Sequence, residues 1–277
     1  MTITTQVWDI ALEGLTAGYG PKVVLENIST VLPGGKISMV LGGSGCGKST
    51  LLRQIIGLSA PMEGKVLLGG NDFFAMKDAE FRRMRRRMGV LFQDGALLGS
   101  LTVGENIALP LREHTHLKEA EVQEIVLHKL SLVGLAHTTA LYPSQLSGGM
   151  RKRAGLARAL VTDPPILLCD EPTSGLDPIS AAQMDALLLE MRERFPSMTI
   201  VCVSHDMESV KAIADHVLVL HEKQVIFQGS LHNLQETTKP YLLQFLARAP
   251  MREEEQGASY PLSEATRAHM HRELELQ

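Results

Sequence analysis

The chain has 277 residues, of which 44% are hydrophobic, and a formal net charge of −4. This length suits one large domain with a subdomain and a tail, and the charge argues against a surface devoted to nucleic acid. The N-terminus lacks the pattern of a secretory signal, and the apolar runs are strand-sized, so we expect no membrane-spanning segment. Three scattered cysteines favour a reducing compartment over a disulfide framework or a zinc site.

The N-terminal part of the chain reads as strands separated by turns. Strands are predicted at residues 9–20 and 23–32, followed by a Pro-Gly-Gly turn. Residues 36–43 form a further predicted strand that ends in glycines, and residues 48–58 continue as a helix. Residues 64–70 resemble another strand between turns.

An arginine-rich segment follows. Residues 78–89 are predicted to form a helix, with Phe81, Met84 and Met88 on one face and arginines around them. The basic run at 82–87 suits either a nucleic acid or an anionic membrane surface, or the solvated face of a helix. We favour the solvated face, because it is one short basic patch in an acidic protein.

A strand predicted at 87–93 leads into a stretch of helical character at about 97–162. Its apolar residues recur at helical spacing between Val122 and Val133. A last helix follows the segment Leu146 to Met150 and stops before Pro164. We therefore expect a helical insert in this part of the chain.

Strands and helices then alternate, which is typical of a parallel sheet covered by helices. Strands are predicted at 165–172 and 198–206, and helices at 179–195 and 207–220. The polar C-terminal residues from about 250 onward contain too few apolar side chains for a core of their own. They are expected either to dock on a partner or to remain a disordered end.

A glycine-rich segment matches the full phosphate-loop pattern and lies between a predicted strand and a predicted helix. Glycines let backbone N–H groups approach an anion, and the following helix presents unsatisfied N–H groups and a positive dipole end. Lys48 is expected to bridge the β- and γ-phosphates of a nucleotide, and Ser49 to hold Mg²⁺. The predicted nucleotide-binding residues of this loop are Gly42, Gly43, Ser44, Gly45, Cys46, Gly47, Lys48, Ser49 and Thr50.

Two carboxylates end the predicted strand at 165–172. Asp170 is expected to orient the Mg²⁺ shell, and Glu171 to reach the attacking water as a general base. Two acidic residues after a strand are common, and their pairing with a phosphate loop gives them this interpretation. Phosphoanhydride hydrolysis otherwise depends mainly on positioning and charge stabilisation.

From Tyr19 to about residue 230 the chain resembles the ATPase subunits of ABC transporters, with five motifs in the family's order. The resemblance implies an α/β P-loop fold of the ABC ATPase type. That fold has a mainly parallel sheet flanked by helices, an antiparallel β subdomain and the helical insert at about 97–162. The ATPase domain is then expected at 1–245, followed by a C-terminal extension at 246–277 that is a candidate for docking on the partner subunit.

The family's signature loop matches Leu146 to Met150. The resemblance implies that Ser147, Gly148 and Gly149 contact the ATP held by a second copy of the chain. Two ATP molecules would then lie between two subunits arranged head to tail.

The remaining motifs match residue by residue. The resemblance implies that Tyr19 stacks on adenine, that Gln93 contacts Mg²⁺ and water, and that His205 contacts the γ-phosphate as part of the catalytic geometry. It assigns Ser174 to Asp177 to the loop that links the two sites across the dimer. The predicted catalytic residues are Glu171, His205 and Gln93, and the predicted metal ligands are Ser49, Gln93 and Asp170.

Met150 departs from the family's usual glutamine and resembles the Mla branch of phospholipid-trafficking ATPases, as does the segment 92–115. This likeness implies an ATPase on the cytoplasmic side of a bacterial inner membrane that drives phospholipid between inner and outer membranes. Its expected partners are an integral membrane permease, an Mce-type periplasmic protein and, as a further candidate, a STAS-domain protein, with no nucleic acid. The alternatives are an importer ATPase for amino acids or another small solute, and a soluble ABC ATPase outside transport.

Overall fold

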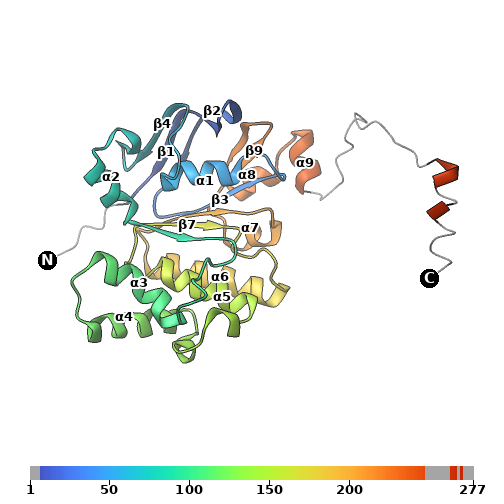
Figure 1. Cartoon of the computed structure of the whole chain (residues 1–277). Coiled ribbons are helices and arrows are strands. Elements are labelled where there is room, and N and C mark those ends of the chain that lie inside the picture. The colour runs from blue at the N-terminus through green and yellow to red at the C-terminus, as the bar shows by residue number, and fades with distance from the viewer. Residues whose placement is uncertain (1–6, 247–262, 267–268, 271–277) are drawn as a thin grey trace. The chain divides into compact units, whose positions relative to one another are not determined.

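The computed structural model describes residues 7–246, 263–266 and 269–270 (Figure 1). The chain divides into two compact units, residues 1–236 and 237–277. In the second unit, helix α9 (Pro240–Leu246) carries Tyr241 and Phe245, whose rings stack with centroids 6.2 Å apart. The domain boundary expected at residue 245 stays a prediction, and most of the expected extension at 246–277 lies outside the described residues. Across the part of the chain that is described, no helix combines the length and apolarity needed to cross a bilayer.

The N-terminal strands form an antiparallel sheet, as the sequence predicts. Its order is β2-β1-β4-β5. Strands β1 and β2 pair up to Tyr19 opposite Lys22, so a tight hairpin presents Tyr19 at its tip. The strands of this sheet are β1 (Ile10–Tyr19), β2 (Lys22–Leu32), β4 (Glu63–Leu68) and β5 (Asn71–Asp72).

The second sheet is parallel except at one edge, where β10 runs antiparallel to β9. Its order is β10-β9-β3-β8-β7-β6, and β3 and β8 are buried along their whole length. Because the carboxyl ends of parallel strands meet at one edge, the loops after β3, β6, β7 and β8 gather there. The strands are β3 (Ile37–Gly42), β6 (Met88–Leu91), β7 (Ile166–Asp170), β8 (Thr199–Val203), β9 (His216–His221) and β10 (Gln224–Gly229).

Helix α1 (Lys48–Ile56) lies between the two sheets (Figure 1). Its side chains Leu51, Leu52 and Ile55 join a core made with β1, β2 and β4 on one side and with β7, β8 and β9 on the other. Trp8, 5% exposed, closes one end of this core, and its carbonyl oxygen accepts a hydrogen bond from Thr199 Oγ1 of β8 at 2.7 Å. The Arg87 guanidinium lies 5.6 Å from the centre of the Trp8 ring.

The predicted helical insert is confirmed as a group of helices after β6. Thr102 and Glu105 form a capping box at the start of α3, worth about 1 kcal/mol. Val122, Val126 and Leu130 of the predicted stripe are buried. The helices and 3₁₀ turns are α3 (Val103–His114), α4 (Glu119–Leu132), η2 (Ala136–Thr138), η3 (Pro143–Gln145) and α5 (Gly148–Ala159).

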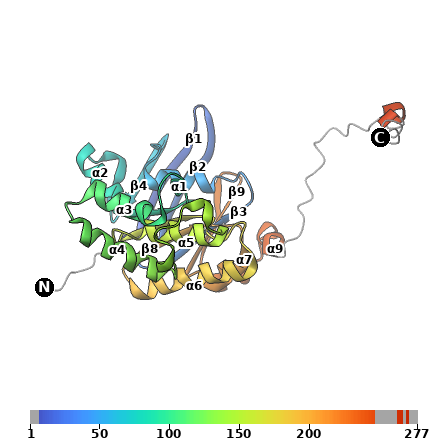
Figure 2. The same ribbon diagram turned by 60° about the horizontal axis from the view of Figure 1, so that its bottom comes forward.

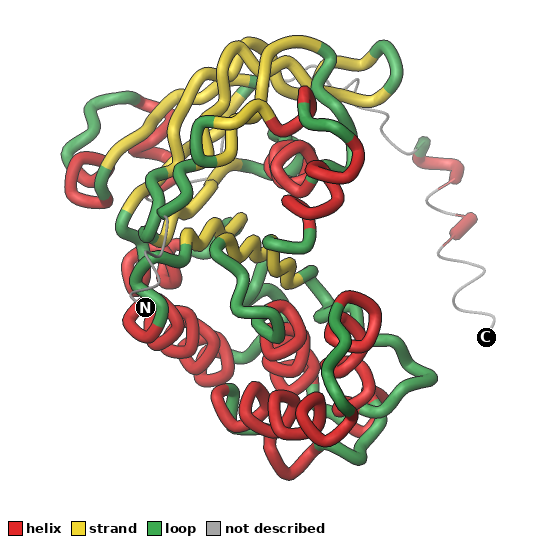
Figure 3. The backbone as a smooth tube through the Cα atoms, turned by 90° about the vertical axis from the view of Figure 1, so that its left-hand side faces the viewer, coloured by secondary structure: helices red, strands yellow, loops and turns green. Residues whose placement is uncertain are grey.

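Figure 2, in which the lower side of Figure 1 comes forward, shows α4, α5 and α6 on that side of the parallel sheet. Figure 3 distinguishes these helices from the strands by colour. The remaining elements are η1 (Phe73–Ala75), α2 (Asp78–Arg85), α6 (Pro178–Arg194), α7 (Met207–Ile213) and α8 (Leu231–Gln235).

Two predicted helices end earlier than expected. Helix α2 ends at Arg85, and Met88 belongs to β6, where it pairs with Ile166. The helix predicted at 207–220 ends at Ile213, and its second half is strand β9. Val217 to Leu220 are completely buried beside β3, so pairing in the sheet outweighs a local apolar pattern that also suits a helix.

Candidate nucleotide-binding site

The loop between β3 and α1 adopts the backbone geometry of an anion cradle. Gly42 and Gly47 have φ angles of 152° and 108°, in the region that glycine favours. A Cβ on Gly42 would lie 2.4 Å from the Leu220 carbonyl oxygen, so the loop needs glycine there for space as well. Gly47 is the N-cap of α1 and offers no side-chain cap, which leaves the first N–H groups of the helix for an anion.

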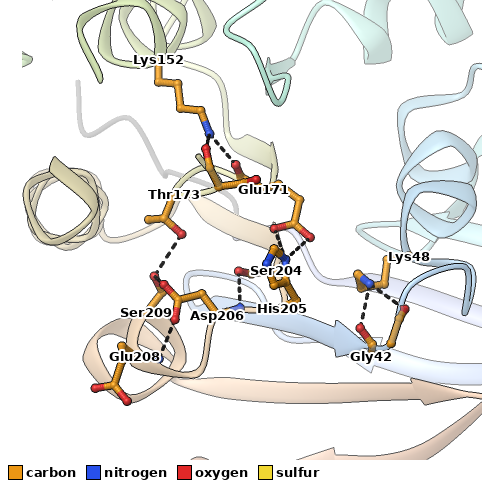
Figure 4. A network of polar contacts seen from close by, with 12 residues as sticks. Gly42, Lys48, Lys152, Glu171, Thr173, Ser204, His205, Asp206, Glu208 and Ser209 are labelled. Carbon is orange, nitrogen blue, oxygen red and sulfur yellow. Dashed lines mark hydrogen bonds and ion pairs between the residues drawn. The ribbon is translucent and has the colours of Figure 1, made fainter. Parts of the chain in front are cut away.

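Lys48 lies inside this loop. Its Nζ donates to the carbonyl oxygens of Gly42 at 2.8 Å and Gly43 at 2.9 Å (Figure 4). The ammonium is thereby held over the loop that presents the N–H groups. A phosphate bound to those groups would meet a cation already in place.

A cleft of about 450 Å³ opens beside this loop. It brings together residues from the hairpin, the phosphate loop, the β6 and β7 ends and the segment after β8. Its lining residues are Tyr19, Lys22, Val24, Ser44, Gly45, Gly47, Lys48, Ser49, Thr50, Gln93, Asp170, Glu171, Ser174 and His205. Of the predicted loop residues, Gly42, Gly43 and Cys46 do not line the cleft and instead build the loop behind it.

Tyr19 stands at the mouth of the cleft. It is 48% exposed, and its hydroxyl lies 3.2 Å from Thr50 Oγ1. Arg53 Nη1 donates to the same hydroxyl at 3.3 Å, and the guanidinium lies 5.8 Å from the ring centre. An exposed aromatic ring fixed at its hydroxyl end can stack on a planar base with the face that Arg53 does not cover.

The two carboxylates at the end of β7 differ in their surroundings. Burial raises the pKa of the Asp170 carboxyl above its ordinary value, and repulsion from Glu171 adds to this, whereas Arg53 and Lys48 oppose it. A carboxylate whose charged form is disfavoured in this way is stabilised by a nearby cation. Ser49, Gln93 and Asp170 all line the cleft and all carry oxygen donors, the ligand type that Mg²⁺ prefers, so the residues present suit this metal.

Glu171 and His205 both line the cleft and contact one another directly. His205 Nδ1 lies 3.0 Å and 2.9 Å from the two carboxylate oxygens of Glu171 (Figure 4). Glu171 has a φ of 51°, a left-handed conformation that costs a residue with a side chain about 1–3 kcal/mol. Such strain is kept where surrounding contacts hold the backbone, and it is common at functional sites.

Gln93 is exposed in the loop after β6. Arg158 of α5 holds this loop, donating to the carbonyl oxygens of Gly95 at 3.0 Å and Ala96 at 2.8 Å. Further on, the buried Asn106 side chain bonds the backbone of Leu98 and Thr102. The segment that follows Gln93 is therefore tied to the helical insert at several points.

None of the signature residues Ser147, Gly148 and Gly149 lines the cleft of its own chain. They begin α5, where Ser147 is the N-cap and its Oγ accepts from Met150 N at 3.2 Å. Ser147 and Gly148 are exposed. Within one chain, the structure brings together the other predicted catalytic, base-stacking and metal-binding residues and leaves this turn facing outward.

Sequence reasoning missed several residues of this region. Lys22, which lies opposite Tyr19 in the hairpin, and Val24 both line the cleft, and Arg53 contacts Tyr19 one turn into α1. Lys22 could have been found from the sequence, because it is a basic residue two positions after the Gly-Tyr-Gly turn. Lys152 of α5, which donates to the backbone of Glu171 and Ser174, had no such signal, because its partners lie 19 and 22 residues away.

Known proteins that are similar to this chain include ATP-binding proteins of transport systems, which agrees with a nucleotide-binding site. A family model described as "ABC transporter" matches residues 25–174. The intermembrane phospholipid transport system ATP-binding protein MlaF of Haemophilus influenzae is 41% identical over 86% of this chain and 89% of its own length. The MlaF of Escherichia coli is 42% identical over 82% and 84%. The probable ribonucleotide transport ATP-binding protein mkl of Mycobacterium tuberculosis is also 42% identical over 86% of this chain, which spans only 66% of that relative's length.

Solved structures give the same fold. The ATP-binding cassette MJ0796, determined as a dimer bound to ADP and Pi, has a TM-score of 0.73 and 30% identity, and covers 80% of this chain and 98% of its own. The protein cbiO1 from Clostridium perfringens, part of the ABC transporter complex cbiONQ, has a TM-score of 0.76 and 29% identity, and covers 83% and 91%. The predicted fold is confirmed. The family model matches more than half of the chain, and these relatives are similar over most of it; this chain therefore belongs to the ABC transporter family, as one of its ATPase domains.

Proposed function

We propose that this chain hydrolyses ATP to drive phospholipid trafficking between the inner and outer membranes of a bacterium. The ATPase part rests on the cleft that gathers Tyr19, Lys48, Gln93, Asp170 and Glu171. The phospholipid part rests on the similarity to two MlaF proteins over most of their length. The chain would then act at the cytoplasmic side of the inner membrane, with a permease, an Mce-type protein and a STAS-domain protein as partners.

In the proposed site the nucleotide lies between Tyr19 and the phosphate loop. Lys48 and the N–H groups of α1 bind its phosphates, and Ser49, Gln93 and Asp170 hold Mg²⁺. The metal would supply charge neutralisation on the phosphate oxygens. Glu171 accepts the proton of the attacking water, and His205 holds the Glu171 carboxylate at its present distance of 2.9–3.0 Å.

The proposed working unit is a pair of chains with two nucleotides between them. The observation that carries this is the outward position of Ser147 and Gly148, outside the cleft of their own chain. A helix N-terminus suits a phosphate, and a second copy arranged head to tail would bring its bound nucleotide to this turn. Cysteines introduced by Ser44→Cys and Ser147→Cys should crosslink between chains with ATP and not without it; an ATP-independent crosslink, or none, would contradict the arrangement.

A basic groove of about 460 Å³ next to Phe92 is the proposed docking surface for the permease. Arg82 and Arg86 of the α2 region and Arg158 of α5 lie along it, so a permease segment with acidic side chains is the complementary partner. Arg82→Glu with Arg86→Glu should reduce assembly with the permease and leave ATP binding unchanged. Arg83→Glu is the matched control, because Arg83 lines a different hollow.

The cargo is tested on the assembled complex. The chain purified with its native membrane partners should carry phospholipid, identified by mass spectrometry, and its ATPase rate should depend on lipid. One observation favours a second cargo, since the mycobacterial relative is named for ribonucleotide transport. Turnover stimulated by ribonucleotide, amino acid or another small solute, without bound lipid, would favour a solute transporter. Salt-sensitive RNA or DNA binding without any membrane partner would favour an ABC ATPase outside transport.

A further inference from the structure

Lys152 is a buried cation next to the candidate catalytic carboxylate. It lies in the second turn of α5 and is 5% exposed. Its Nζ donates to the carbonyl oxygen of Glu171 at 2.9 Å and to that of Ser174 at 2.5 Å (Figure 4). Burial lowers the pKa of Lys152, and attraction to Asp94 and Glu171 opposes this. Burying an ammonium group is costly unless hydrogen bonds compensate it, so the two carbonyl contacts are what keep it in place.

The backbone that Lys152 holds is the strained part of the site. Glu171, with its left-handed φ of 51°, donates its own N–H to the Val203 carbonyl at 2.9 Å. Its carbonyl accepts from Ser174 N at 3.2 Å and from Lys152. Between them, Thr173 Oγ1 lies 3.3 Å from Ser209 Oγ of α7. The turn from Glu171 to Ser174 is thus fixed by β8, α7 and α5 together.

The conformation of this turn determines where the Glu171 carboxylate points. The side chain is 14% exposed and directed at His205. If the peptide after Glu171 relaxed toward an ordinary right-handed or extended conformation, the direction of its Cα–Cβ bond would change. Displacement of a reacting group by about 1 Å is enough to cost about 10²-fold in rate.

We propose that Lys152 is a positioning residue for ATP hydrolysis, which holds the backbone of Glu171 and Ser174 so that the Glu171 carboxylate stays directed into the cleft. The inference rests on the proposed role of Glu171 as the general base. Helix α5 would then have two functions. Its N-terminus carries Ser147 of the signature turn, and its second turn holds the backbone of Glu171 in the cleft of the same chain. The position of the signature turn and the geometry of Glu171 are therefore mechanically linked within each subunit.

A second buried lysine shows what a structural role looks like. Lys129 of α4 is 3% exposed, but its Nζ meets the carboxylate of Asp163 at 2.5 Å, and neither residue lines the cleft. Lys129→Met therefore also removes a buried ammonium group from the helical insert, but one whose partner is a carboxylate outside the cleft. It is the matched control for Lys152→Met.

The experiment measures ATP turnover and ATP affinity for the chain assembled with its membrane partners. Lys152→Met should lower kcat about 10- to 100-fold, with KM and the equilibrium Kd for ATP within about twofold of the parent. Lys152→Arg should restore kcat to within about threefold, because a guanidinium can still donate to two carbonyl oxygens. Lys129→Met should leave kcat within about twofold. Should Lys152→Met not fold, Lys152→Gln replaces it in each comparison.

A double variant shows whether Lys152 acts through Glu171. In a Glu171→Gln background, Lys152→Met should cause no further loss in single-turnover rate, since the group it positions is already gone. A further loss of single-turnover rate in the double variant would overturn the inference. So would an unchanged kcat in Lys152→Met, or a loss of kcat in Lys129→Met as large as that in Lys152→Met. Normal turnover in Glu171→Gln alone would instead remove Glu171 from the proposed function, so the two failures are distinguishable.

Discussion

Asp185 makes the folding stability of this protein depend on pH in a direction opposite to that of most carboxylates. It lies on α6, is 7% exposed, and its Oδ1 has no hydrogen-bond partner among the described residues. Burial raises the pKa of its carboxyl from 3.8 to about 6; a hydrogen bond with Ser209 opposes the rise, and the charge of Asp206 adds to it. The charged form is therefore disfavoured in the folded chain.

The sign follows from proton binding. Between about pH 4 and pH 6 the folded state holds a proton on Asp185 that the unfolded state has released, so stability falls as pH rises through this window and is constant above it. The difference between about 6 and 3.8, at roughly 1.4 kcal/mol per pKa unit, corresponds to about 3 kcal/mol. Asp185→Asn, which cannot ionise, should recover this free energy at neutral pH.

The assay is urea denaturation of parent and variant from pH 4 to pH 8. Asp185→Asn should be about 3 kcal/mol more stable at pH 7, and the difference should vanish near pH 4. Glu190→Gln is the control on the same helix, since the Glu190 side chain is 47% exposed and its ion pair with Arg194 is worth little. An Asp185→Asn variant less stable than the parent at pH 7 would refute the reasoning, because it would mean that the ionised carboxylate is stabilised by a partner.

Three further predictions concern the cleft and the signature turn. Glu171→Gln should bind ATP normally and lower kcat about 10²–10⁴-fold, trapping a dimer visible by size-exclusion chromatography with ATP; turnover at the parent rate would count against a general base. Lys48→Ala should raise the Kd for ATP at least about tenfold in an equilibrium titration, because a charge-assisted contact to phosphate contributes about 1.5–3 kcal/mol; an unchanged Kd would place the phosphates elsewhere. Met150→Gln should preserve ATP binding, since Met150 does not line the cleft, while altering lipid transport by the complex. Unchanged transport would show that this methionine does not distinguish the Mla branch.

The sequence predicted those parts of the fold whose signals are local. The phosphate loop, the strand before it and the helix after it are contiguous, and all three are confirmed. The segment 207–220 was wrong in its second half because an apolar run such as Val217 to Leu220 suits a helix and a buried strand equally. The segment forms a strand because it occupies the position in the sheet between β3 and β10.

In the candidate site, too, residues with a local sequence signal were predicted and residues without one were missed. Residues such as Tyr19, Gln93 and His205 belong to short motifs, and the structure places them around one cleft with Lys48. Their chemical roles stay predictions. Lys152 could not be found in this way, because its two acceptors are backbone carbonyl oxygens on a different segment and carry no residue-type signature. A contact of this kind is defined by tertiary packing alone.

The chain's single tryptophan gives it a built-in optical probe. Trp8 is buried where the antiparallel sheet meets β8, under the Arg87 guanidinium, and it does not line the nucleotide cleft. Its fluorescence should therefore remain constant when nucleotide binds within a rigid chain, and should shift to longer wavelength as soon as the two sheets separate. A change in emission on adding ATP would mean that the hairpin carrying Tyr19 moves as a body against the rest of the ATPase.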